Sequence, residues 1–263
     1  MPKFCANISL LYTEVPLEER VSRAKADGFE SFEVQFPYSI EPAEWRRQMD
    51  LHGVDCVLFN VEAGDLMQGG EGLAAVPERQ ASFRQAVDQA LVYAQWLRPA
   101  VINVLPGRCR RAQQRDLYLS TLGENLAYAA ERFSALGITT CLEAINTTDM
   151  PDFLIHNSGQ MAQLLEAVGR PDVKMQYDLY HMAMMQQPLT ADLGHYLDRI
   201  GHIQFADAPG RGEPGSGELD LAGLFAEIDR LGYQGWVGAE YRPTRETSCT
   251  LGWRGPSQDL SLG

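Results

Sequence analysis

Short runs of β-branched and aromatic residues alternate with longer amphipathic segments along the whole chain. The short runs predict buried strands and the amphipathic segments predict helices, and each pair occupies roughly 25 to 40 residues, the length of a βα unit. The expected strands lie at Phe4–Leu10, Phe32–Phe36, Val54–Val61, Val101–Leu105, Ile138–Ile145, Val173–Tyr177, His202–Phe205 and Trp236–Glu240. The expected helices lie at Leu17–Asp27, Pro42–His52, Pro77–Leu97, Asp116–Leu136, Ser158–Val168, Leu193–Ile200 and Leu221–Leu231.

Residues that start and stop helices agree with this division. Gly28, Gly53 and Gly137 each follow an expected helix, and Pro77 stands at the start of another. Glycine often ends a helix because it readily adopts a positive φ, and proline is tolerated in the first turn. Ser158 is the expected N-cap of its helix.

Eight strands in strict alternation with helices predict a parallel sheet, and eight is the number of βα units that closes a (β/α)₈ TIM barrel. An open, doubly wound sheet is the alternative, but no glycine fingerprint follows the first strand. No linker, repeat or charge block divides the chain. We therefore expect a single domain over residues 1–263.

The composition narrows the class of protein. The chain is 45% hydrophobic and carries a formal net charge of −13, so it can bury a core and is a poor partner for nucleic acid or an anionic membrane. No signal peptide or long apolar run is recognisable, which makes the cytoplasm the expected location. The sequence leaves both a monomer and a homo-oligomer open.

The five cysteines are scattered and never occur in a C-x-x-C spacing. This pattern is typical of reduced thiols rather than of a disulfide framework or a zinc site. Cys56 and Cys141 lie within apolar runs, and we expect both to be buried and unreactive.

Oxygen-bearing side chains recur where successive strands of the expected barrel end. They are Glu143, Asp178, Gln204 and Glu240. The active site of such a barrel forms at the carboxyl ends of its strands, and three carboxylates buried together require a cation. An all-oxygen donor set favours Mg²⁺ or Mn²⁺ over zinc, so we expect one divalent metal ion and no organic cofactor.

Other polar residues near these strand ends are candidates for contact with a substrate. His181 follows Asp178 by three residues, and Arg211 lies in a loop rich in glycine and proline. The guanidinium of Arg211 suits a substrate carboxylate, for which Arg108 is a weaker candidate. Asn7, on the first strand, could line the pocket or only satisfy hydrogen bonds of the barrel.

Several motifs, in order along nearly the whole chain, together resemble hydroxypyruvate isomerase, a family of the xylose isomerase-like barrels. The motifs are Asn60-Val-Glu-Ala-Gly-Asp65, Glu143-Ala-Ile-Asn146, Gln176-Tyr-Asp178-Leu-Tyr-His181, Gly201-His-Ile-Gln204, Pro209-Gly-Arg211-Gly-Glu-Pro-Gly-Ser-Gly-Glu218 and Gly235-Trp-Val-Gly-Ala-Glu240-Tyr.

The resemblance implies roles for the residues that match. Glu143, Asp178, Gln204 and Glu240 correspond to metal ligands, and Glu143 and Glu240 also to the proton donor and acceptor. His181 and Arg211 look like substrate contacts. The implied reaction interconverts hydroxypyruvate and tartronate semialdehyde.

The chain departs from the family pattern at three positions. Ala144 stands where the family usually has proline, and Leu66 and Glu71 stand where it tends to have an aromatic residue and an arginine. Because the arginine could help to hold a carboxylate, these departures bear on the choice of acid more than on the type of reaction.

Other functions remain open on the sequence alone. A 2-oxo-tetronate isomerase or a sugar 3-epimerase could use the same barrel. A phosphodiesterase similar to the apurinic endonuclease barrels is disfavoured by the acidic composition and the scarcity of histidine. A sugar-acid binding protein without catalytic activity is the alternative from another class.

Overall fold

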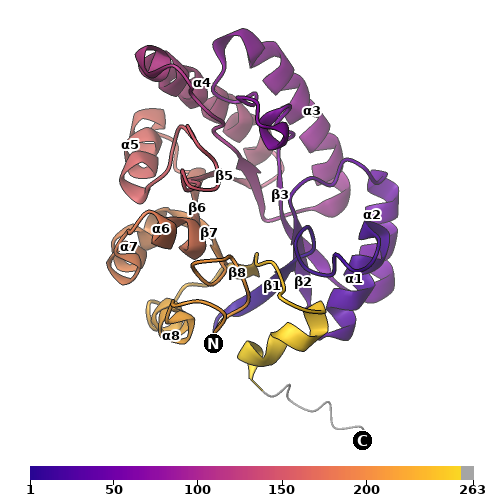
Figure 1. The fold of residues 1–263 in the computed structure, drawn as a ribbon. Helices are drawn as coiled ribbons and strands as arrows, with labels where there is room; N and C mark the ends of the chain where they lie inside the picture. Colours follow the sequence, from indigo (N-terminus) through magenta and orange to yellow (C-terminus); the bar gives the residue numbers. More distant parts are fainter. Residues whose placement is uncertain (256–263) are drawn as a thin grey trace, which may run out of the picture.

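A computed structural model describes residues 1–255 as a closed barrel of eight parallel strands in sequence order, as predicted (Figure 1). The strands are β1 (Lys3–Asn7), β2 (Ser31–Val34), β3 (Asp55–Asn60), β4 (Val101–Val104), β5 (Thr139–Glu143), β6 (Val173–Asp178), β7 (Ile200–Phe205) and β8 (Trp236–Ala239). The α-helices are α1 (Leu17–Ala26), α2 (Pro42–His52), α3 (Gln80–Leu97), α4 (Arg115–Ser134), α5 (Ser158–Val168), α6 (Leu179–Met184), α7 (Leu189–Tyr196) and α8 (Leu221–Arg230). Short 3₁₀ helices occupy Leu66–Gln68, Pro77–Arg79, Ala112–Gln114, Leu197–Arg199 and Thr247–Arg254.

Pairing between the first and last strands closes the barrel. Lys3 pairs with Trp236 and Ala6 pairs with Ala239, both in parallel register. This closure excludes the open, doubly wound sheet. The expected single domain extended to residue 263, but residues 256–263 lie outside the described part of the chain.

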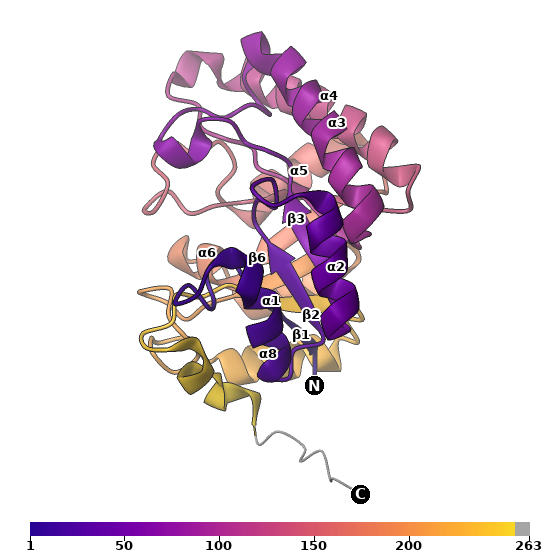
Figure 2. The same cartoon turned by 90° about the vertical axis from the view of Figure 1, so that its right-hand side faces the viewer.

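The helices form a ring around the strands, and the main hydrophobic core lies between the two layers (Figures 1 and 2). The 3₁₀ helix at Thr247–Arg254, which the sequence reading did not include, contributes Trp253 to this packing. The Trp253 ring lies 5.0 Å from the ring centroids of both Phe4 and Phe205, in edge-to-face geometry. The 3₁₀ helix thereby packs against side chains of β1 and β7.

The first strand is shorter than predicted. It ends at Asn7 because the side-chain oxygen of Asn7 accepts the backbone N–H of Ser9 at 3.0 Å and starts a turn. The prediction of strand up to Leu10 was therefore wrong, since asparagine competes with the strand ladder for backbone hydrogen bonds.

The region after β6 also differs from the prediction. Helix α6 begins directly after Asp178, whose side chain accepts the backbone N–H of Tyr180, in a segment expected to be a loop. The helix expected at Leu193–Ile200 starts earlier, at Leu189, and Ile200 already belongs to β7. Both errors arise because two short helices lie where the apolar pattern suggested one.

The predicted N-cap of α5 was wrong by one residue. Asn157 is the cap, and its side-chain oxygen accepts the backbone N–H of Gln160 at 2.9 Å. Ser158 is the first residue of the helix, and its hydroxyl contacts Gln187 instead.

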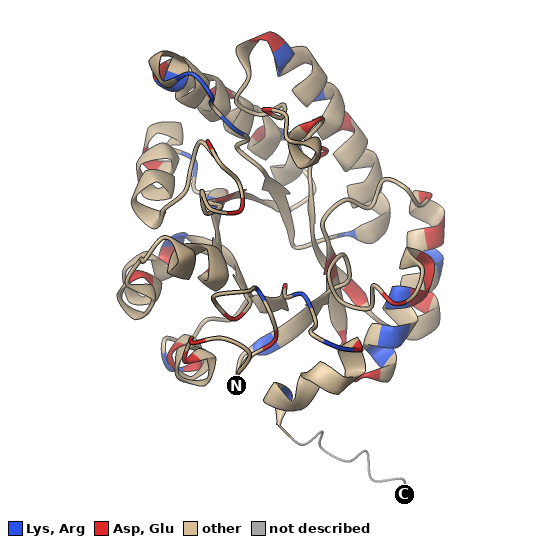
Figure 3. Cartoon of the chain, in the orientation of Figure 1, with Lys and Arg blue, Asp and Glu red and all other residues tan. Residues whose placement is uncertain are grey.

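The surface charges of both signs are interleaved on the outer helices, as Figure 3 shows for α1 and α2. Exposed pairs such as Arg47–Glu44 contribute little to stability individually. All five cysteines are free thiols, and Cys56 and Cys141 are buried, as expected. Among the described residues, no helix combines the length and the apolar character that a membrane span needs.

Candidate active site

Three carboxylates meet where β5, β6 and β8 end. Glu143 is the last residue of β5, Asp178 is the last residue of β6, and Glu240 directly follows β8. Together with the His181 imidazole they form a buried group in which one potential ligand atom from each residue lies within 4.8 Å of the others. Parallel strands bring their carboxyl ends to one face of the barrel, which explains the convergence of residues far apart in sequence.

The electrostatics of this group favour a bound cation. Burial, reinforced by Glu240, raises the pKa of Asp178 to about 7. Burial and then the charges of Glu240 and Asp178 raise the pKa of Glu143 well above its usual range. The three carboxylates therefore resist ionising together unless positive charge is supplied.

One oxygen of Asp178 is placed to bind such a cation. The Oδ1 atom accepts the backbone N–H of Tyr180 at 2.8 Å, whereas the buried Oδ2 has no hydrogen-bond partner among residues 1–255. A buried carboxylate oxygen is rarely left without a partner, because desolvation then goes uncompensated. The carboxylate oxygens of this group fit a hard divalent cation.

Amide side chains hold the two glutamates in place. Asn103 donates to Glu143 Oε2 at 3.0 Å. Asn7 and Gln35 both donate to Glu240 Oε1, each at 2.9 Å. These bonds fix one oxygen of each glutamate.

The His181 ring has its tautomer set by Asn146. The Asn146 Oδ1 accepts two backbone N–H groups, from Thr148 and Asp149, so its Nδ2 is the donor that faces His181 Nδ1 at 2.7 Å. The remaining ring nitrogen, Nε2, then carries the proton and lies 3.5 Å from Asp178 Oδ2. Burial, followed by the charge of Arg211, lowers the pKa of His181 well below its usual value, so the ring is neutral and can donate one hydrogen bond.

The Arg211 guanidinium lies among the carboxylates. Its Nη2 is 2.6 Å from Glu240 Oε2 and 3.9 Å from Asp178 Oδ2. The guanidinium also lies over the Tyr180 ring, 5.3 Å from the centroid. Arg211 itself lies in the loop after β7 with a φ of +58°, in the left-handed region.

A cavity of about 140 Å³ opens beside this group. Its walls combine the carboxylates with apolar side chains from the loops after several strands, which is the make-up of a site for a small polar molecule. The lining residues are Gln35, Phe36, Asn60, Met67, Leu105, Glu143, Ile145, Asp149, Met150, His181, Arg211, Glu240 and Arg242.

Comparison with known proteins agrees with the fold. Residues 21–254 match the family described as xylose isomerase-like TIM barrel. The chain is 40% identical to the 2-oxo-tetronate isomerase of Cupriavidus necator over 97% of this chain and 98% of that one. The chain belongs to the xylose isomerase-like TIM barrel family.

Two further relatives cover nearly the full length. The hydroxypyruvate isomerase of Escherichia coli is 38% identical, over 97% of this chain and 99% of that one. A crystal structure from Brucella melitensis, titled AP endonuclease family 2, superimposes with a TM-score of 0.94 at 37% identity, over 98% of this chain and 100% of that one. The near-complete coverage by proteins named as isomerases makes this family member an isomerase.

Gln204 is buried on β7, two residues after His202. Its amide nitrogen donates to Glu33 Oε1 at 2.7 Å, and its amide oxygen accepts from Gln176 at 2.6 Å. Its role as a fourth metal ligand stays a prediction. In that role the amide oxygen of Gln204 would bind the ion in place of its hydrogen bond from Gln176.

Arg108 does not join the cavity wall. Its guanidinium donates to the backbone oxygens of Pro151, Leu66 and Gly70 at 2.8 to 3.1 Å and ties together the loops after β3 and β5. Asn7 lies deeper than a substrate contact, because it bridges Glu33 and Glu240.

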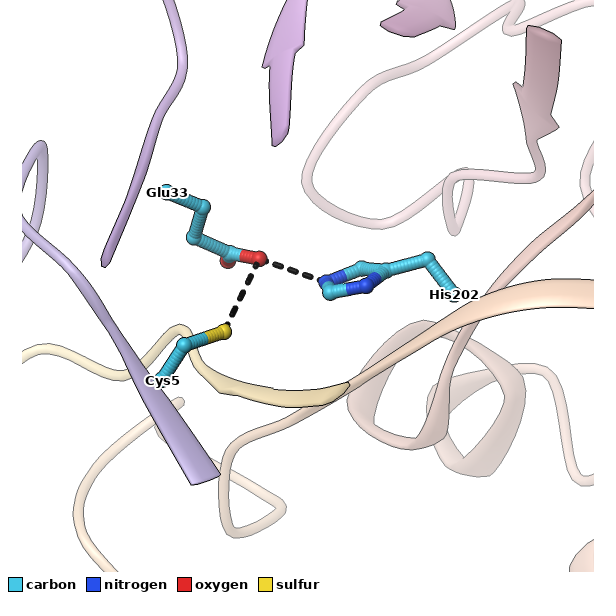
Figure 4. A group of neighbouring side chains, drawn as sticks. All are labelled: Cys5, Glu33 and His202. Atoms are coloured by element: carbon cyan, nitrogen blue, oxygen red, sulfur yellow. Dashed lines mark hydrogen bonds and ion pairs between the residues drawn. The ribbon is translucent and has the colours of Figure 1, made fainter. Parts of the chain in front are cut away.

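Glu33 is a buried residue of the site that the sequence analysis did not include. Its carboxylate accepts from Asn7 at 2.8 Å and Gln204 at 2.7 Å, and lies 2.6 Å from His202 Nε2, with the Cys5 thiol 3.9 Å away (Figure 4). The signal for it was a lone glutamate inside an apolar strand, where a charged residue needs a specific partner.

The Glu33 carboxylate anchors both Asn7 and Gln204 from inside the barrel. Gly238 on β8 makes room for it, because a Cβ at that position would lie 2.4 to 2.6 Å from the carboxylate atoms. A side chain at position 238 would therefore displace Glu33.

Proposed function

We propose that this isomerase interconverts hydroxypyruvate and tartronate semialdehyde, with Glu143 and Glu240 as the acid-base pair. The proposal is carried by one observation: Glu143 and Glu240 lie with Asp178 in a buried group beside a small cavity. The identity of 38% to a hydroxypyruvate isomerase over nearly the full length supports this choice of substrate.

The reaction moves hydrogen between adjacent carbons. One glutamate removes a proton from C3 of hydroxypyruvate, the electron pair of that C–H bond forms the C2–C3 double bond, and the carbonyl electrons move to O2. The enediolate then collapses: a proton is returned to C2 by the other glutamate, the O3 proton is lost to O2, and C3 becomes the aldehyde. The net change is redox-neutral within one molecule and needs no organic cofactor.

We assign Glu143, Asp178, Gln204 and Glu240 as ligands of one divalent ion, Mg²⁺ or Mn²⁺. Such an ion supplies positive charge that stabilises a developing enediolate. The unpartnered Asp178 Oδ2 and the all-oxygen donor set support this assignment.

The neutral His181 donates its Nε2–H to a substrate oxygen in this proposal. The His181 Nε2 atom lies 3.9 Å from Glu143 Oε1 and 3.5 Å from Asp178 Oδ2, and His181 lines the cavity, which supports this role. Arg211 holds Glu240 in orientation through their ion pair and contacts the substrate from the same side.

The reaction can be tested by proton NMR of hydroxypyruvate in D₂O with enzyme treated with EDTA and reloaded with Mg²⁺ or Mn²⁺. We expect tartronate semialdehyde to form with deuterium incorporated at C2, because the proton delivered to C2 comes from the second glutamate, whose carboxyl group exchanges with solvent between turnovers. Activity that persists after EDTA treatment, or an absence of turnover with either metal, contradicts the proposal.

A second candidate is isomerisation of the four-carbon acid 2-oxo-tetronate, favoured by the 40% identity to the isomerase of that name. The chemistry and residues are the same, so only the relative kcat/KM of the two acids separates them. Parallel assays that include a neutral ketose also test 3-epimerase activity. Tight acid binding without turnover in any metal would favour a binding protein.

A further inference from the structure

Two arginines line the cavity, and they differ in whether their charge is paired with a carboxylate. The Arg211 guanidinium is buried against Glu240 and Asp178. The Arg242 side chain is exposed, and among residues 1–255 it makes no hydrogen bond or ion pair. Arg242 is therefore the cation at the cavity whose charge is not already used.

The backbone of Arg242 is held firmly although its side chain is free. Its N–H donates to the carbonyl oxygen of Arg211 at 2.7 Å, which joins the loop after β8 to the loop after β7. Two residues further on, Thr244 makes two hydrogen bonds to the Glu213 carboxylate in the same neighbouring loop. The guanidinium thus starts from a fixed point two residues after Glu240.

The charge balance of the cavity floor shows what Arg242 can recognise. Arg211 pairs with Glu240 and lies near Asp178, so its charge is directed at the carboxylates of the protein itself. A neutral ligand needs no charged partner, whereas a carboxylate brought into the cavity is favoured by a cation that is not already paired. Arg242 supplies that charge at the mouth of the cavity.

We propose that Arg242 is the specificity residue that binds the substrate carboxylate and selects acids over neutral ketoses. This inference rests on the proposed function for the substrate class. A planar guanidinium can hold a carboxylate through two parallel hydrogen bonds, and it can reach inward once the reacting carbons lie beside the glutamates. Arg211, for which a substrate contact stays a prediction, already pairs with Glu240.

The test compares hydroxypyruvate with dihydroxyacetone, in which a neutral CH₂OH group replaces the carboxylate. In the Mn²⁺-loaded enzyme, we expect Arg242→Gln to raise KM for hydroxypyruvate about ten- to hundredfold, as for a lost charge-assisted hydrogen bond, with kcat changed less than about threefold. The ratio of kcat/KM for hydroxypyruvate to kcat/KM for dihydroxyacetone should fall by a similar factor, and Arg242→Lys should restore part of the affinity for hydroxypyruvate. Arg245→Gln is the matched control, because it removes an exposed charge from the same loop without lining the cavity.

A binding measurement separates this inference from the proposed reaction. Calorimetric titration of D-glycerate, an acid that lacks the reacting carbonyl, reports carboxylate recognition without turnover. Weaker glycerate binding in Arg242→Gln but not in Arg245→Gln supports the role of Arg242 even if hydroxypyruvate is not turned over. Unchanged KM and unchanged glycerate affinity in Arg242→Gln overturn it even if the isomerase activity is present.

Discussion

Glu143 and Glu240 have unequal surroundings, although both are buried. The Glu240 carboxylate accepts hydrogen bonds from Asn7, Gln35 and Arg211. Glu143 accepts only from Asn103 among the described residues. Hydrogen bonds to a carboxylate favour its ionised form, so Glu240 is the better stabilised anion and Glu143 holds a proton more readily.

Replacing either glutamate by glutamine should abolish proton transfer and leave the fold intact. We expect Glu143→Gln and Glu240→Gln each to lower kcat by about a hundredfold or more, because a positioned acid-base group is lost while the amide keeps the shape. Turnover of hydroxypyruvate is measured by steady-state kinetics and the fold by circular dichroism. Near-normal kcat in both variants would remove these residues from the mechanism.

Glu33→Gln should act through the residues that Glu33 holds. The amide cannot accept from Asn7, Gln204 and His202 together, so we expect unfolding free energy to fall by about 3–5 kcal/mol. Because Asn7 and Gln204 lose their anchor, metal affinity should also fall about 10- to 100-fold.

Urea unfolding and calorimetric titration with Mn²⁺ measure the two effects of Glu33→Gln. The exposed Glu30→Gln is the control, since it removes a carboxylate just before β2. A stability loss with unchanged metal affinity would show that Glu33 supports the barrel alone.

Among single residues, the sequence predicted those at strand ends but not the side chains that hold them in place. Glu143, Asp178 and Glu240 were identifiable because the carboxyl ends of parallel strands meet, whatever the spacing in sequence. Glu33 could not be placed, because its partners come from β1 and β7, and pattern alone does not say which interior residues face each other. Arg108 was misjudged for the same reason: its three acceptors are backbone atoms that only the folded loops bring together.

Among the elements, long helices were predicted closely and short ones were not. The bounds of α2 and α5 agree with the prediction at both ends, because proline, glycine and a regular apolar face mark them. Helix α6 has six residues, too few for a repeating pattern, and it exists because Asp178 caps its first turn. The same aspartate thus ends a strand, starts a helix and offers its free oxygen to the site.

The start of α5 provides a test at the scale of one element. We expect Asn157→Ala to lower unfolding free energy by about 1 kcal/mol, because the N–H of Gln160 loses its acceptor. Asn157→Asp keeps an acceptor and places a negative charge at the helix N-terminus, so it should retain the stability. Chemical denaturation compares the three proteins; equal stability of the alanine and aspartate variants would contradict the capping assignment.

For the whole molecule, the buried carboxylates link stability to metal and to pH. In the folded protein the pKa of Asp178 is raised to about 7, compared with about 4 in the unfolded chain. Between these two pH values the metal-free folded state keeps a proton that the unfolded chain releases. This group therefore favours folding at low pH, and its contribution is lost as pH rises through about 7. A bound cation reverses the preference, because it binds the ionised form and competes with protons.

Metal removal should consequently lower the melting temperature, and more at pH 8 than at pH 6. At a free metal concentration of about 100 times Kd, binding adds about 2.7 kcal/mol, which in a chain of this size corresponds to about 5–10 °C. Differential scanning fluorimetry of EDTA-treated protein, with and without Mn²⁺ at the two pH values, measures the shift. Asp178→Asn is the matched variant: its oxygen can still accept from the N–H of Tyr180, but one charge is removed, so the metal-induced shift should shrink. An equal shift in Asp178→Asn, or one that is larger at pH 6 than at pH 8, would mean that the metal stabilises the barrel from somewhere other than these strand ends.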